Sequence, residues 1–299
     1  MAETKFSHIP VLLKEAIDFL AVKRGGTYVD ATLGLGGHSY EIAKLLGRDG
    51  KLIGFDKDPA ALARARETLS EPPAELKHNW PEIRFEHASF AKLGEVLEPD
   101  SIDGLLADLG VSSLQLEDAS RGFSFQADGP LDMRMNPTEG MTADQVVNRM
   151  DETSLANVIY EFGEERRSRR IARAIVRARP IRSTQHLVDV ISAAARPMKF
   201  ERIHPATRTF QAIRIFVNRE LDDVKALLCS APSVLKKNGR LVVISFHSLE
   251  DRIVKDAIRE GAQKGWYEVL TRKPVTAGEE EIESNPRSRS AKLRAAERV

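Results

Sequence analysis

The sequence contains a single cysteine, Cys229, among its 299 residues. An internal disulfide framework is therefore excluded, and so low a cysteine content is typical of a protein in the reducing cytosol. Cys229 falls in an apolar stretch with helical periodicity, so we expect a small buried residue and not a nucleophile. The first residues show no signal-peptide pattern, which also favours a cytoplasmic protein.

Long apolar runs, metal-ligand spacings and an excess of charge are missing as well. No apolar run is long enough to span a bilayer, and the histidines and acids lack the spacing of a metal site, so we expect neither membrane nor metal. The formal net charge is only +1, so any affinity for nucleic acid must come from local patches. With 42% hydrophobic and 30% charged residues, the composition is that of a soluble globular protein with room for two domains.

A glycine-rich turn is the most informative feature that is present. Residues 28–29 resemble a short buried strand, residues 30–39 (DATLGLGGHS) contain the turn, and residues 41–46 have the pattern of a helix. Glycine suits such a turn because its backbone visits positive φ and because a ligand approaches bare backbone. The next apolar run, residues 51–55, ends at Asp56, and an acid about 20 residues past a glycine turn can accept hydrogen bonds from a ribose diol. The sequence thus predicts a nucleoside-cofactor site on a parallel sheet.

These residues leave the class of cofactor open. Gly34-x-Gly36-x-x-Ser39 approaches the dinucleotide fingerprint, but Ser39 replaces its third small residue. Asp30 favours S-adenosylmethionine, because an acid before the turn can face the ammonium group that this cofactor carries and a pyrophosphate lacks. A methyltransferase is therefore favoured over a dehydrogenase. In a third interpretation the glycines only shape a strand-to-helix turn.

Strand and helix patterns alternate over residues 26–108, which implies a parallel sheet covered on both faces. Residues 83–86 and 102–108 predict the third and fourth strands. The fifth, residues 240–246, follows only after more than a hundred residues, which is too many for a normal crossover. The intervening segment has helical periodicity, so we predict an inserted helical subdomain, with one long helix over residues 210–228 leading back to the sheet.

A run of arginines in this insertion suggests a surface for nucleic acid. On a helix, Arg166, Arg170, Arg173 and Arg177 fall on one stripe, which suits a phosphate backbone. Alternatively, the stripe is a solvated face paired with the neighbouring acids 164 and 165. Further cations that favour RNA are Arg202, His204, Arg208, Arg287, Arg289, Lys292 and Arg294.

Asp108 ends the fourth predicted strand, at the sheet edge where α/β proteins place their ligands. Methyl transfer to an exocyclic amine needs an acceptor that orients the amine and takes up its developing positive charge, and we assign this role to Asp108. The base must leave its stack to enter the pocket. Phe123, Phe125 and Phe246 are candidates to stack on it, although a place in the core explains each of them more simply.

Taken in order, the motifs resemble those of the bacterial 16S ribosomal RNA (cytidine-N4)-methyltransferases over nearly the whole chain. The matching runs are HIPVLLKE (8–15), GLGGHS (34–39), DLGVSSLQL (108–116), RGFSF (121–125), GPLDMRM (129–135), HPATRTFQA (204–212), SFHSLEDR (245–252) and RSRSAKLR (287–294). The resemblance implies a class I methyltransferase (Rossmann-like) sheet with an inserted all-helical subdomain. It implies S-adenosylmethionine as donor and a cytidine in the decoding region of the small ribosomal subunit as acceptor. We expect residues 1–114 and 216–299 to form the methyltransferase domain and 115–215 the substrate-recognition domain.

The resemblance also implies roles for single residues. The cofactor contacts carry over to Gly36, Gly37, His38, Asp56 at the ribose, Phe90 at the adenine, and Asp108 and Gln115 around the methionine end. The RNA contacts that we expect are Arg166, Arg170, Arg173, Arg177, Arg208 and Arg289. Other amino-group methyltransferases carry an Asp/Asn-Pro-Pro-aromatic motif after the fourth strand, whereas residues 108–111 here are DLGV. The aromatic that clamps the base must therefore come from elsewhere.

Three motifs have a purely structural alternative. Ser248 and Asp251 have the spacing of a capping box, so helix initiation explains them as well as catalysis does. The segment 8–11 either closes over the cofactor or packs against the sheet. Residues 204–208 either contact RNA or only separate two helices. A second function class therefore stays open, a nucleoside-cofactor protein or dehydrogenase whose arginines pair with acids.

Overall fold

The computed structural model describes residues 9–196 and 204–299. The chain divides into two compact units, one formed by Met1–Gly110 with Leu221–Val299 and the other by Val111–Glu220. In the described ranges, no helix combines the length and the apolar character needed to cross a membrane. His8 and Arg202, which the sequence analysis singled out, lie outside the described residues.

The first unit is built on a seven-stranded sheet with the strand order β3-β2-β1-β4-β5-β7-β6. Its strands are β1 (Thr27–Asp30), β2 (Lys51–Asp56), β3 (Glu82–His87), β4 (Ile102–Asp108), β5 (Leu235–Ser245), β6 (Tyr267–Val269) and β7 (Lys292–Arg298). The first five strands are parallel, whereas β7 runs antiparallel to both of its neighbours, β5 and β6. This order confirms the predicted class I methyltransferase sheet. The expectation of a parallel sheet is corrected at one edge, because β7 is antiparallel.

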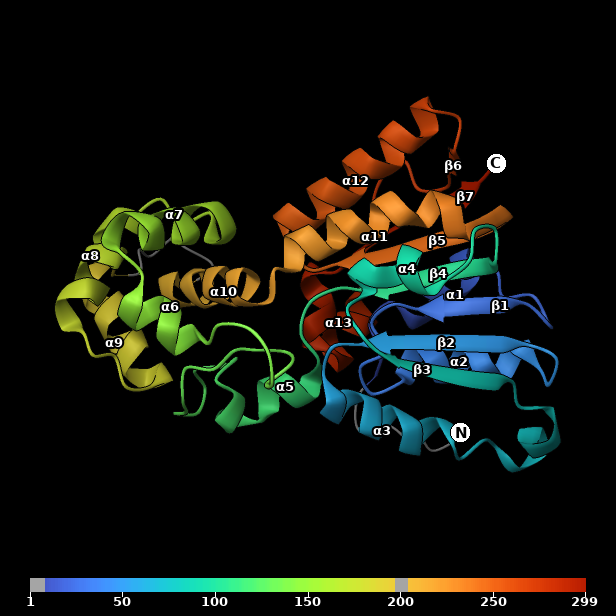
Figure 1. Cartoon of the computed structure of the whole chain (residues 1–299), viewed down its shortest axis with the longest axis horizontal. Helices are drawn as coiled ribbons and strands as arrows, with labels where there is room; N and C mark the ends of the chain where they lie inside the picture. Colours follow the sequence, from blue (N-terminus) through green and yellow to red (C-terminus); the bar gives the residue numbers. More distant parts are fainter. Residues whose placement is uncertain (1–8, 197–203) are drawn as a thin grey trace. The chain divides into compact units, whose positions relative to one another are not determined.

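Helices cover the sheet because successive strand residues point to opposite faces. On one face, Leu105 and Val243 share a core with Val224 of α11 and Val254 of α12. On the other, the neighbouring residues Leu106 and Val242 share a core with α1 and α2. The helices of this unit are α1 (Leu13–Leu20), α2 (Gly37–Leu46), α3 (Pro59–Leu69), α4 (Leu93–Val96), α11 (Glu220–Val234), α12 (Ser248–Gln263) and α13 (Glu279–Ser284). Figure 1 draws α11 and α12 in orange.

The second unit is helical, as predicted for the insertion. It contains α5 (Ser113–Glu117), α6 (Ala143–Arg149), α7 (Glu152–Gly163), α8 (Ser168–Ala178), α9 (Thr184–Ala194) and α10 (Pro205–Asn218). The apolar stripes of these helices meet in one core, in which Leu155, Ile171, Leu187 and Ile213 are fully buried. Phe123 belongs to this core and Phe125 packs against it, with its ring 5.0 Å from that of Phe210. The core explanation therefore holds for both phenylalanines.

Two expectations for the segment after residue 210 are wrong. The single helix over 210–228 is broken at Arg219, whose φ of 54° is left-handed, so that α10 ends at Asn218 and α11 begins at Glu220. The guanidinium of Arg214 holds both carboxylate oxygens of Glu220 at 2.9 Å and spans the break. Cys229 is exposed, because it lies on the side of α11 opposite to its buried apolar residues.

Candidate active site

Three acids end neighbouring strands of the first unit. Asp30 is the last residue of β1, Asp56 of β2 and Asp108 of β4, and β1 lies between the other two in the sheet. Because these strands are parallel, the three carboxyl groups share one edge. The candidate site lies at this edge of the sheet. The turn after β1 and the start of α12 contribute further residues to it.

Asp56 fastens the glycine turn to the sheet. Its Oδ2 accepts the N–H of Gly34 at 2.8 Å and its Oδ1 accepts the N–H of Asp58 at 2.8 Å. Burial raises the pKa of Asp56 to about 6, although both backbone bonds favour the charged form. Each carboxylate oxygen has further lone pairs, so the side chain can hold the turn and still accept ribose hydroxyls.

Glycine is required in the turn for a different physical reason at different positions. Gly34 and Gly36 have φ of 53° and 83°, a left-handed conformation that favours glycine. A Cβ on Gly37 would lie 2.6 Å from Cγ of Pro10, so the N-terminal segment packs directly on the start of α2. Residues 9–11 thus pack against this unit. The N–H of Gly36 bonds to the carbonyl of Leu33, so any ligand contact at Gly36 must use other atoms.

His38 is buried at the start of α2 and links the N-terminal segment to Asp108. Its Nε2 lies 3.0 Å from the carbonyl oxygen of Val11, and its Nδ1 lies 3.7 Å from Oδ2 of Asp108. Burial lowers the pKa of His38, so the ring is neutral. A neutral ring that donates from Nε2 to the Val11 carbonyl has an unprotonated Nδ1, which faces Asp108.

Asp108 carries the clearest sign of an incomplete environment. Its Oδ1 is buried and has no hydrogen-bond partner among the described residues, while the side chain as a whole is 24% exposed. Burial and the charges of Asp30 and Glu250 raise the pKa of Asp108 well above its ordinary value. Buried polar atoms are normally satisfied, so an orphaned carboxylate oxygen at a ligand edge indicates a place for a donor or a cation.

Asp30 has a structural role that the sequence did not suggest, because it forms hydrogen bonds within the protein. It is 1% exposed, its Oδ2 accepts the hydroxyl of Ser39 at 2.7 Å, and its Oδ1 accepts the N–H of Thr32 at 3.1 Å. The expected contact of Asp30 with a ligand's ammonium group stays a prediction. Its charge also raises the pKa values of Asp56 and Asp108.

Phe90 and Gln115 lie in different units. Phe90 begins a short 3-10 helix directly after β3 and packs, partly buried, against the core under α11. Gln115 is 4% exposed, and its side-chain oxygen accepts the N–H of Ser112 at 3.0 Å in a capping box that starts α5. Their expected contacts with adenine and with the methionine end stay predictions.

The start of α12 brings an acid to the site that the sequence analysis missed. The predicted capping box of Ser248 and Asp251 is wrong by one residue, because His247 is the N-cap and Glu250 completes the box. Glu250 is 1% exposed, and its Oε2 accepts the N–H of Phe246 at 2.9 Å. The SFHSLEDR motif contained this signal, but histidine is an unusual N-cap and its spacing to the acid was not considered.

Asp251 instead forms ion pairs with β7. Its Oδ1 lies 2.7 Å from Arg294 Nε, and its Oδ2 lies 3.3 Å from Lys292 Nζ. Arg294 is only 7% exposed. These two cations, which had favoured RNA binding, therefore stabilise the packing of α12 on the sheet. Arg289, in a 3-10 helix before β7, is exposed.

In the second unit, the four arginines of the predicted stripe are all exposed, although Arg166 precedes the start of α8. Of the four, Arg173 has an ion pair, in which its Nε lies 3.2 Å from Glu152. The proposed pairing of the stripe with Glu165 is wrong. Glu165 is 1% exposed and its oxygens hold Arg167 at 3.0 Å and Arg208 at 3.5 Å.

Two other residues of the second unit that were expected to favour RNA binding, Arg208 and His204, have partners within the protein. Arg208, expected to bind RNA, has an internal partner in Glu165. His204 caps α10, because its Nδ1 accepts the N–H of Ala206 at 3.1 Å. The structural explanation of residues 204–208 thus accounts for His204.

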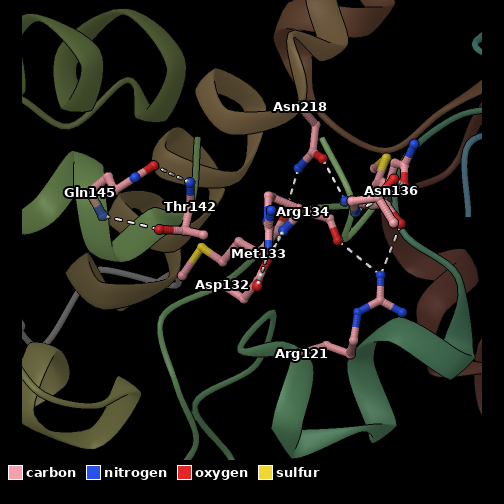
Figure 2. Close-up of polar contacts among 10 residues, drawn as sticks. Arg121, Asp132, Met133, Arg134, Asn136, Thr142, Gln145 and Asn218 are labelled. Carbon is pink, nitrogen blue, oxygen red and sulfur yellow. Dashed lines mark hydrogen bonds and ion pairs between the residues drawn. The ribbon is translucent and has the colours of Figure 1, made fainter. Parts of the chain in front are cut away.

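The irregular segment after α5 is firmly held, as Figure 2 shows. The guanidinium of Arg121 donates to the carbonyl oxygens of Arg134 and Met135 at 2.9 Å. The amide of Asn218 accepts the N–H of Met135 and donates to the carbonyl of Met133, each at 2.7 Å. Met133 is buried and has a left-handed φ of 59°, so these bonds fix a conformation that a free loop would avoid.

A family model, named relatives and solved structures are similar to this chain. A family model described as the MraW methylase family matches residues 5–299. Two proteins named "Ribosomal RNA small subunit methyltransferase H" are similar over nearly the whole chain. That of Koribacter versatilis is 69% identical over 98% of this chain and 95% of its own, and that of Acidobacterium capsulatum is 66% identical over 97% and 98%. A solved rRNA methylase from Streptococcus thermophilus aligns over 98% of this chain and 99% of its own, with 14% identity and a TM-score of 0.42.

Proposed function

The chain belongs to the MraW methylase family, and we propose that it transfers a methyl group from S-adenosylmethionine to the N4 amine of a cytidine. The cytidine lies in the decoding region of 16S rRNA in the small ribosomal subunit, in line with the name of the relatives that are 66–69% identical. The dehydrogenase that the glycine turn left open is excluded by the family. The observation that carries the proposal is the orphaned Oδ1 of Asp108 at the end of β4.

The residues of the first unit fit S-adenosylmethionine. Asp56 has lone pairs for the ribose, Gly34 in the left-handed turn is only partly buried, and Phe90 offers a ring at the end of the next strand. The carboxyl groups at the edge are desolvated, so they favour a ligand that carries positive charge. When bound, the cofactor supplies an activated methyl group on a sulfonium.

The protein's own chemical task is positioning and handling of charge. Asp108 accepts one N–H of the exocyclic amine, which points the nitrogen lone pair at the methyl group. The amine would become positively charged as the new N–C bond forms and the methyl–sulfur bond breaks, with a neutral thioether as the leaving group. The carboxylate stabilises the charge on the amine and then takes the proton. His38, neutral and with Nδ1 at 3.7 Å from Asp108, is placed to share that proton.

The second unit is assigned to substrate recognition. We propose residues 1–114 and 216–299 as the methyltransferase domain and 115–215 as the domain that recognises the RNA. The exposed stripe of Arg166, Arg170, Arg173 and Arg177 supports this assignment, because exposed guanidinium groups suit phosphates. We also propose a cytoplasmic location, which follows from the proposed ribosomal substrate.

The test is methyl transfer to a defined acceptor. Purified protein is incubated with methyl-labelled S-adenosylmethionine and small subunits that lack the modification, and both nucleosides and ribonuclease fragments of the 16S rRNA are then analysed by mass spectrometry. We expect N4-methylcytidine at one position of the decoding region. Label at another base, or no label on either subunits or free 16S rRNA, would contradict the proposal.

A further inference from the structure

The first unit supplies an aromatic ring beside Asp108 from an unexpected strand. Asp108 is paired with Ile244 across β4 and β5, and the N–H of Leu109 donates to the carbonyl of Ile244 at 2.9 Å. Gly110 and Phe246 are each two residues beyond this pair, so both leave the sheet at the same point. Phe246 therefore stands where the chain after β4 has no aromatic of its own.

The space over Gly110 is open on one side and bounded by this ring. Gly110 has a φ of 98°, and among the described residues other than its chain neighbours, a Cβ built on it would meet within 4 Å only Cδ2 of Phe246, at 3.6 Å. A base that reaches Asp108 at this edge would therefore meet bare backbone at Gly110 and the ring of Phe246 beside it.

The ring is held in place from behind. The N–H of Phe246 donates to the buried carboxylate of Glu250 at 2.9 Å, and Glu250 belongs to the capping box that starts α12. Phe246 is partly buried and packs against the same core as Ile244 and Leu293. Protein contacts therefore hold the side chain, while the residue as a whole stays partly exposed.

We propose that Phe246 is the stacking partner of the target cytosine, and that Gly110 leaves room for the base so that its N4 reaches Asp108. The inference rests on the proposed function, since it needs a cytidine acceptor. Phe123 and Phe125 pack in the core of the second unit, and Phe90 follows β3, which is separated from β4 by two strands. Replacing an aromatic side chain by an aliphatic one removes the stacking energy of the base, which makes the inference testable.

The experiment compares Phe246→Tyr with Phe246→Leu. Stacking contributes about 1–3 kcal/mol per base, so Phe246→Leu should lower kcat/KM for unmodified small subunits by about 5- to 150-fold. Phe246→Tyr should keep it within about threefold, because the ring is retained. Calorimetric affinity for S-adenosylmethionine and the melting temperature should match the wild type in both variants. Should the leucine variant melt early, Phe246→Met provides the aliphatic comparison.

Two controls separate the possible failures. Phe90→Leu makes the same change at the other aromatic of this edge, and it should lower affinity for S-adenosylmethionine. A wild type that does not methylate cytidine overturns the proposed function. An active wild type whose Phe246→Leu and Phe246→Tyr variants have equal kcat/KM overturns the stacking role alone. Loss of donor affinity in Phe246→Leu would also overturn it, since the ring would then serve the cofactor.

Discussion

Asp56 holds the glycine turn and, in the proposed site, the ribose. We expect Asp56→Ala to weaken binding of S-adenosylmethionine by about 1.5–3 kcal/mol, the usual range for hydrogen bonds to a charged group. Titration calorimetry measures this directly. Asp56→Asn is the matched control, because its amide oxygen still accepts one backbone N–H and its affinity should fall less. Unchanged affinity in a folded alanine variant would remove Asp56 from the site.

The same residue links stability to pH. Its pKa is raised from 3.8 to about 6 in the folded protein, so the folded state binds more protons between these values. Its contribution to stability is therefore fully present below pH 3.8 and is lost as the pH rises through 6. Relative to Asp56→Asn, the cofactor-free wild type should lose about 3 kcal/mol of unfolding free energy across this window. Urea unfolding at several pH values measures the difference, and a constant difference would contradict the burial of this charge.

Asp108 is expected to act in the transition state. Asp108→Asn should lower the single-turnover rate more than it lowers affinity for S-adenosylmethionine, because the positive charge on the amine develops only as the methyl group moves. If rate and affinity fall equally, Asp108 is a cofactor ligand only. If the rate matches the wild type, the residue has no chemical role.

At the scale of the element, a charge at the start of α12 should influence the pKa of Asp108. The carboxylate must be ionised to take a proton, so the rate should fall as the pH drops through its raised pKa. The charge of Glu250 contributes to that rise. We expect Glu250→Gln, which keeps an oxygen for the N–H of Phe246, to move this acid limb to lower pH. The pH profile of single-turnover rates measures the shift.

The next residue of the same helix provides the control for that shift. Asp251 pairs with Lys292 and Arg294 and is not among the charges that affect Asp108. Asp251→Asn should therefore lower thermal stability and leave the acid limb in place. An equal displacement of the limb in both variants would show that α12 acts through its packing and not through the charge of Glu250.

The elements differ in how far their sequences determine them. The strand at 102–108 was predicted with its correct bounds, because an apolar run ends there in an acid. The break at Arg219 could not be predicted, since apolar periodicity continues on both sides and neither glycine nor proline marks it. β7 was missed because its cations suggested RNA, whereas their partner Asp251 lies far away in the sequence.

The candidate site likewise has some features that are local in the sequence and others that depend on the fold. The three edge acids follow from strand ends, which are local features of the sequence. Two other features depend on β4 and β5 being neighbours in the sheet. The charge of Glu250 raises the pKa of Asp108, and the ring of Phe246 lies next to Gly110. Pairing of strands separated by more than a hundred residues is not contained in any local pattern.

For the whole molecule, charge placement matters more than net charge. The net charge of +1 gives no general attraction to RNA, so affinity must come from patches in which cations lack internal partners. Lys292 and Arg294 are engaged by Asp251, and Arg167 and Arg208 by Glu165. Within the described ranges, Arg170 and Arg177 of α8 are exposed and form no ion pair. They are therefore the sharpest sites at which to test RNA binding.

We expect Arg170→Glu with Arg177→Glu to weaken binding to small subunits and to lower the slope of log affinity against log salt by about 1.4–1.8, for two lost phosphate contacts. Affinity for S-adenosylmethionine should hold, because its proposed ligands are elsewhere in the chain. Lys225→Glu with Arg259→Glu is the matched control: both positions are exposed in the first unit, the net charge changes equally, and the slope should stay. Salt titrations and melting curves on both double variants show whether the arginines bind RNA or only stabilise the fold. Normal binding with a lower melting temperature would mean that the stripe only stabilises the fold, and an unchanged slope would direct the search to the exposed Arg289.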